Sequence, residues 1–122
     1  MGEAGYEAAR DPLLRLARNR KEKSRVRAEA ARALGKLRIA KGDLARHLTA
    51  LLEDPDRRVK RGAIAGLGDL AVRESVVALV GQLGGDFDLA ARATLVDITG
   101  LPAETDWKAW FESGDCEIPS GT

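Results

Sequence analysis

Side chains that could perform catalysis or bind a metal are few in this sequence and lie far apart. His47 is the only histidine and Cys116 the only cysteine, which leaves no histidine pair, no cysteine cluster and no disulfide within the chain. Carboxylates come close together only in turns, as Asp54 with Asp56 and Asp86 with Asp88. We interpret these pairs as helix caps and turn residues rather than as a catalytic dyad or a calcium loop. The sequence therefore predicts no catalytic residue, no metal site, no cofactor and no enzymatic activity.

Positive charge is concentrated in the N-terminal half of the chain. Residues 1–61 carry 17 Lys and Arg against 9 Asp and Glu, whereas residues 62–122 carry 3 against 10. The densest basic run consists of Arg15, Arg18, Arg20, Lys21, Lys23, Arg25 and Arg27. This run is either a solvated helix face with a polar loop or a docking patch for an acidic protein or a nucleic acid. The opposite charges of the two halves also predict weak head-to-tail self-association.

The composition favours an all-α fold. The chain has 20 Ala and 16 Leu but only 11 Val and Ile together, and Ala and Leu prefer helices over strands. No stretch approaches the roughly 18 apolar residues that a membrane-spanning helix needs. The first residues show no basic segment followed by an apolar run, as a secretory signal would have. With a single cysteine, these features lead us to expect a cytoplasmic protein.

An internal repeat organises the sequence. Three segments, which begin at Val26, Val59 and Phe87, share one pattern of an apolar residue followed by Ala at +4, a small residue at +7, Leu at +8 and Leu or Ile at +11. These positions lie on one face of a helix. The small residues at +4 leave room for a neighbouring helix to approach closely. They are Ala30, Ala63 and Ala91.

Turn residues divide the chain into pairs of helices that repeat about every 30 residues. We expect the first helices, over about 4–20, to cap one end of the stack, with Asp11 as the cap and Pro12 in the first turn of a helix that continues to about Arg18. Helices over 43–53 and 75–84 separate the repeated segments, and Asp43, Asp56 and Asp86 occupy expected N-cap positions. The units are then 12–37, 43–70 and 75–100. They form one domain, 1–112, with a C-terminal cap over 103–112 and a flexible tail over 113–122.

The second repeat resembles the short bacterial HEAT-like repeat that also occurs in phycobilin lyases. The resemblance rests on the run DPDRRVK over 54–60, followed by Ala63 and by Leu67–Gly68, and Val26 through Gly35 matches the same pattern. It extends over about residues 12–112 and implies a short α-solenoid of about three helix pairs. The third unit has Asp88 and Val96 where the pattern has a basic residue and a glycine, which is typical of an end repeat. The resemblance carries little information about function, because function on such scaffolds lies in variable surface residues.

The aromatic residues near the C-terminus are spaced as one helix face. Trp107, Trp110 and Phe111 follow the i, i+3, i+4 pattern, and Thr105 can cap that short helix. We interpret this face as the cap that closes the open end of the stack. The alternative is base stacking or an aromatic ligand site, which the surrounding negative charge disfavours.

A solenoid usually binds partners along its ridge of second helices. We therefore predict a non-catalytic scaffold or adaptor that binds another protein, with contacts at Arg46, Ala50, Glu53, Ala78 and Gln82. The alternative function is a nucleic-acid-binding module that uses the basic half, and a third is a subunit of a chromophore-lyase-like enzyme. His47 aligns with Leu79 of the next unit and is interpreted as a half-buried packing residue, the alternative being proton transfer or metal binding.

Overall fold

The computed structural model describes residues 3–37, 39–114 and 118, and this part of the chain is helical with no strand. The helices are α1 (Glu3–Arg18), α2 (Ser24–Lys36), α3 (Lys41–Leu51), α4 (Arg57–Leu70), α5 (Arg73–Val80), α6 (Asp88–Thr99) and α7 (Trp107–Glu112). None of these helices is long and apolar enough to cross a membrane. The all-α prediction is therefore confirmed for the described residues.

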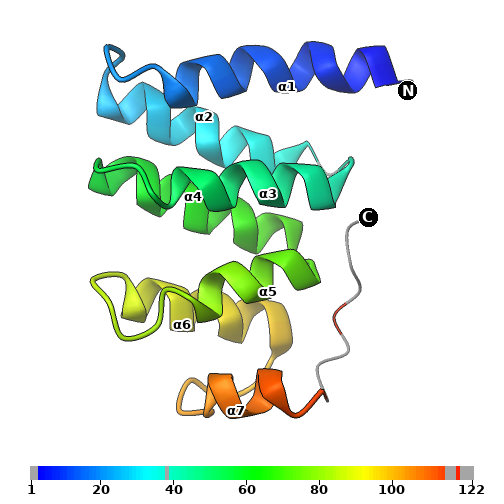
Figure 1. Cartoon of the computed structure of the whole chain (residues 1–122), viewed down its shortest axis with the longest axis vertical. Coiled ribbons are helices and arrows are strands. Elements are labelled where there is room, and N and C mark those ends of the chain that lie inside the picture. The colour runs from blue at the N-terminus through cyan, green and yellow to red at the C-terminus, as the bar shows by residue number, and fades with distance from the viewer. Residues whose placement is uncertain (1–2, 38, 115–117, 119–122) are drawn as a thin grey trace.

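The helices form two layers that are stacked in chain order. In one layer α1 contacts α3 and α3 contacts α5, and in the other α2 contacts α4 and α4 contacts α6. Figure 1 shows α1 at one end of the stack and α7 at the other. By the colour bar, α2, α4 and α6 all begin at the left of that view and end at the right, so they run in the same direction.

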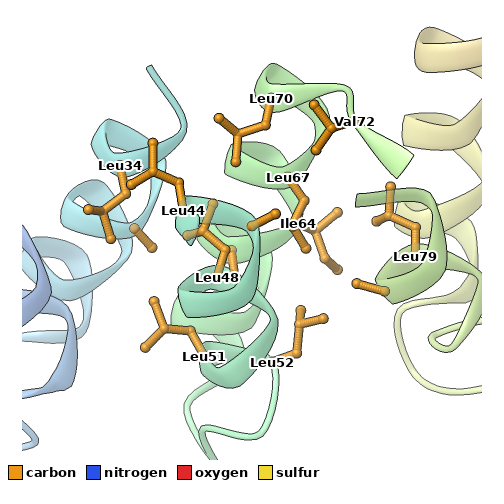
Figure 2. Close-up of a cluster of buried hydrophobic side chains, with 14 of the residues drawn as sticks. Leu34, Leu44, Leu48, Leu51, Leu52, Ile64, Leu67, Leu70, Val72 and Leu79 are labelled. Carbon is orange, nitrogen blue, oxygen red and sulfur yellow. The ribbon is translucent and has the colours of Figure 1, made fainter. Parts of the chain in front are cut away.

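The repeated apolar positions form the core between the layers. The alanines at +4, Ala30, Ala63 and Ala91, are all buried, and the leucines at +8 are completely buried. Figure 2 shows Leu34, Leu67 and Leu79 among side chains that come from α2, α3, α4 and α5. The periodicity therefore assigned the buried +4 and +8 positions correctly in all three repeats, whereas Val26, the first position of the first repeat, is only half-buried and lies outside the core cluster.

Backbone contact between α2 and α4 makes this the closest helix pair. A Cβ atom on Gly35 would lie 2.5 Å from the Cα of Gly66, and one on Gly62 would lie 2.5 Å from the carbonyl oxygen of Ala28. Neither distance leaves room for a methyl group, so only glycine fits at these positions. The two helices therefore touch through small residues on both sides of their crossing.

Three expected helix starts are wrong. Pro12 lies inside α1, which begins nine residues earlier, at Glu3, and continues through Pro12 because Tyr6 is buried and bonded to α3. Asp43 lies in the first turn of α3 after the N-cap residue Ala40, and its carboxylate binds α1 instead of capping. The N-cap of α6 is Phe87 rather than Asp86.

Two other predicted caps lie at the starts of α4 and α7. Asp56 is confirmed as the N-cap of α4, since its side chain accepts hydrogen bonds from the backbone N–H groups of Arg58 and Val59. The N-cap of α7 is Asp106 rather than Thr105, whose hydroxyl instead donates to the carbonyl of Pro102. The predicted flexible tail, with Cys116, lies largely outside the described residues.

Candidate functional site

A groove with basic walls lies between the outer faces of α2 and α4. Its volume is about 260 Å³. The residues that line it are Arg25, Ala28, Glu29, Arg32, Arg58, Arg61, Gly62 and Ala65. All of them come from α2 and α4: the charged side chains are exposed, Gly62 is buried at the contact between the two helices, and none of the lining residues is aromatic.

The repeat builds this groove. Arg25 and Arg58 stand immediately before the first apolar residue of their repeats and are separated by 33 residues, so both project from the first turns of parallel neighbouring helices. The close approach of Gly62 to Ala28 forms the floor. One end is fastened by a hydrogen bond from the Ser24 hydroxyl to the carboxylate of Asp56. The groove is thus a direct product of the repeat and of the small residues at its crossing.

Most of the positive charge in the groove has no partner in the described part of the chain. Arg25 pairs loosely with Glu29, with 3.4 Å between Nε and Oε1, and both side chains are exposed. Arg32, Arg58 and Arg61 have no carboxylate within 4.0 Å among the described residues. Three neighbouring guanidinium groups without a counter-ion repel one another, and an anion in the groove relieves that repulsion.

A second hollow continues the basic surface along α2. It is lined by Glu29, Arg32, Ala33 and Lys36. Arg32 belongs to both hollows, so positive side chains extend from the first to the last turn of α2. The surface is long enough to contact an extended polyanion as well as a short acidic segment.

The structure divides the basic run that the sequence singled out. Arg15 and Arg18 lie on α1, in the other layer, and Arg20, Lys21 and Lys23 lie in the connection between α1 and α2. Of the seven, only Arg25 lines the main groove. The other three arginines of the groove, Arg32, Arg58 and Arg61, were not in the predicted patch. The 33-residue repeat is the sequence signal that could have predicted two of the four groove arginines, because it places Arg58 beside Arg25.

Arg27 is not a surface charge, so its place in the predicted patch is corrected. The side chain is buried, bonds to the carboxylate of Asp54, and donates from Nε to the carbonyl oxygen of Ala17 at 3.0 Å. Burial opposes ionisation of Asp54, but hydrogen bonds from Arg27 and from the backbone N–H of Asp56 outweigh it and lower the pKa of Asp54. Arg27 therefore joins α1, α2 and the turn before α4.

The predicted protein contacts are only partly on the surface. Arg46, Ala50 and Glu53 are exposed on or just after α3. Ala78 is buried, and the exposed side chain on this part of α5 is Val77, at 50%. Gln82 is half-buried and lies beyond the end of α5 at Val80. The prediction for Ala78 fails because α5 turns that residue toward the neighbouring helices.

His47 belongs to a polar cluster between α1 and α3. The carboxylate of Asp43 accepts a hydrogen bond from the Tyr6 hydroxyl at 2.5 Å and one from Arg10 at 3.0 Å. His47 Nε2 lies 3.6 Å from the same carboxylate, and its Nδ1 lies 3.2 Å from Arg18. Burial lowers the pKa of His47, although Asp43 opposes the shift. Burial and the hydrogen bond to Asp43 raise the pKa of Tyr6 to about 12.

This cluster holds α1 against α3, which agrees with His47 as a half-buried packing residue. Both nitrogens of the His47 ring face charged groups that belong to the contact between the two helices. No group of three or more His, Cys, Asp or Glu side chains in the described part of the chain is arranged to hold a metal ion.

Trp107 is the buried aromatic residue of the C-terminal helix. It is 1% exposed, whereas Trp110 and Phe111 are partly exposed. The two tryptophan rings meet edge to face, with 5.8 Å between centroids and 88° between planes. Trp107 is therefore the aromatic side chain through which α7 is buried.

The chain matches no protein-family model, no curated protein and no solved structure. Its function therefore has to be inferred from the groove, its charges and the helices that form it.

Proposed function

We propose that the chain is a short α-solenoid of HEAT-like helix pairs that acts as a non-catalytic binding protein. In this proposal the groove between α2 and α4 holds an acidic segment of a partner protein. The repeat and the two-layer stacking support the solenoid. The observation that carries the function is the set of three unpaired arginines, Arg32, Arg58 and Arg61, around one groove in the described part of the chain.

An acidic peptide suits the groove because it offers two kinds of contact. Aspartate or glutamate side chains reach the guanidinium groups, which bind carboxylates in a bidentate manner. The floor of Ala28, Gly62 and Ala65 presents no charge and accepts small apolar side chains from the same segment. Single-stranded nucleic acid needs aromatic platforms for its bases, and no aromatic residue lines this groove.

Duplex nucleic acid is the second candidate, and the hollow lined by Arg32 and Lys36 favours it. This hollow extends the positive surface along α2, as backbone phosphate contacts require. Duplex binding through phosphates is independent of sequence and weakens steeply as salt is raised. The two candidates therefore differ in their preferred ligand and not in their binding surface.

The test measures binding of a fluorescent Asp/Glu-rich peptide and of a duplex DNA by anisotropy. The variant Arg58→Glu/Arg61→Glu should weaken peptide binding by at least about tenfold, since charge-assisted hydrogen bonds are worth about 1.5–3 kcal/mol each. The matched control Arg15→Glu/Lys21→Glu changes the net charge equally on exposed residues outside the groove and should weaken it far less.

Two results would contradict the peptide proposal. Equal losses for the groove variant and the control would mean that net charge rather than the groove decides binding. Preferential binding of the duplex would favour the nucleic-acid candidate if its affinity also falls steeply with salt. The slope of log affinity against log salt concentration should then correspond to several phosphate contacts.

A further inference from the structure

An acidic stripe that contains an exposed leucine begins in the turn before α6, at Asp86, and continues along the outer face of α6. Asp86, Leu89, Ala93 and Asp97 are spaced three and four residues apart and are all exposed. Leu89 is 83% exposed, against 50% for Val77 and 37% for Leu16, the two other exposed large apolar residues in the described part of the chain. Single exposed aliphatic side chains are common on protein surfaces, so the chemistry that a partner can recognise here comes from the carboxylates on either side of Leu89.

We propose that the stripe on α6 docks in the arginine groove of a second copy of this chain. The inference rests on the proposed function, in which the groove accepts an acidic segment. The chemistry of the two surfaces is complementary, because the groove has arginines around an uncharged floor and the stripe has carboxylates around a leucine. The charge split between the two halves of the chain points the same way.

The stripe cannot reach the groove of its own chain. The helices α2, α4 and α6 are consecutive members of one layer, and we place the groove and the stripe on the outer side of that layer because their charged side chains are exposed. A second copy placed face to face and related by a two-fold axis brings them together. If that axis is parallel to the helices, it reverses the stacking order and places each α6 over the α2–α4 groove of the other copy.

The same symmetry sets the register of the contact. A two-fold axis parallel to the helices does not change the position of a residue along the helix direction. Residues of the two copies that occupy equivalent positions in the repeat therefore face one another. In the sequence repeat Asp86 is equivalent to Arg25 and Arg58, and in the structure it lies in the turn just before α6, which brings its carboxylate to the end of the second copy's groove where these two arginines lie. Leu89 then comes to the small-residue floor near Ala28 and Gly62.

The far end of the stripe is also matched. Asp97 is equivalent to Lys36 on α2, at the end of the basic surface. Within one chain Asp86 is bound only loosely, with 3.8 Å to Arg57 and an 81% exposed side chain, so it exchanges partners at little cost. Because the dimer is two-fold symmetric, it contains two identical contacts, and the grooves of both copies are occupied. Self-association therefore competes with binding of an acidic partner.

Sedimentation equilibrium over a range of protein and salt concentrations tests this inference. We expect a monomer–dimer equilibrium that shifts toward monomer at high salt. Leu89→Ala should weaken dimerisation by at least about a hundredfold, because the dimer contains two identical contacts and each loses most of a buried aliphatic side chain. The matched control is Leu16→Ala, which removes an exposed leucine from α1, in the other layer, and should leave dimerisation unchanged.

Charge exchange tests the register. Arg58→Asp and Asp86→Arg should each weaken the dimer, and the double variant should recover it because the pair is restored with opposite polarity. Circular dichroism confirms that each variant is folded. A monomer at all concentrations, equal effects of Leu89→Ala and Leu16→Ala, or no recovery in the double variant would overturn the inference. If the protein is strictly monomeric but still binds the acidic peptide, the dimer inference is overturned and the proposed function is kept.

Discussion

Replacing Gly35 by alanine should destabilise this protein even though alanine is the better helix former. A Cβ on Gly35 would lie 2.5 Å from both the Cα and the carbonyl oxygen of Gly66, and 2.8 Å from its carbonyl carbon. All three atoms belong to the backbone of α4, so no side chain can rotate away. Ordinary contact requires α2 and α4 to separate by about 1 Å, which opens gaps in the core on either side.

The size of the effect follows from two opposing contributions. Alanine in place of a helical glycine gains about 1 kcal/mol in helix propensity. Overpacking of a close backbone contact costs about 1–3 kcal/mol, and the rigid surroundings of Gly35 favour the upper part of that range. We therefore expect a net loss of about 1–2 kcal/mol in the free energy of unfolding. For a domain of this length the loss corresponds to a fall of roughly 4–8 °C in Tm.

Urea denaturation and thermal melting followed by circular dichroism measure this loss. The matched control is Gly81→Ala, because Gly81 has φ −64° and the atom nearest to a Cβ at that position would be the Ala78 carbonyl oxygen, at 3.3 Å. That variant should be neutral or slightly more stable. A Gly35→Ala protein that is as stable as the wild type would refute the backbone contact between α2 and α4.

Three further predictions concern buried groups. Arg27→Ala should cost about 3–5 kcal/mol in urea denaturation, because it leaves the buried carboxylate of Asp54 without its partner; a cost near zero would contradict the buried pair. The lowered pKa of Asp54 means that its contribution to stability is complete above the unfolded-state pKa of about 3.9 and is lost as the pH falls through the lower folded-state value. Asp54→Asn should therefore flatten the acid side of the stability profile, and an unchanged profile would count against this assignment. Trp107→Ala should cost about 3–5 kcal/mol, while Trp110→Ala should cost less, since Trp107 is the fully buried one of the two; the reverse order of melting temperatures would place the cap on Trp110.

The sequence by itself determined the helical class and the buried face of each repeat. A pattern with apolar residues at +4, +8 and +11 is a local property of a helix, so it identified Ala63 and Leu67 as core residues without any knowledge of neighbours. It also marked Asp56 as a helix cap, because capping involves only the next three residues.

Only the tertiary structure decided which charges are buried and which gather at one place. Arg27 looks like its exposed neighbours in the sequence, and it is buried because Asp54, which lies 27 residues away, comes within reach when α2 packs on α4. Asp43 likewise bonds to Tyr6 on α1 instead of capping its own helix. The groove exists for the same reason. Arg32 and Arg61 become neighbours through the glycine contacts at the helix crossing, and contacts between residues distant in the chain leave no periodic signal within either helix.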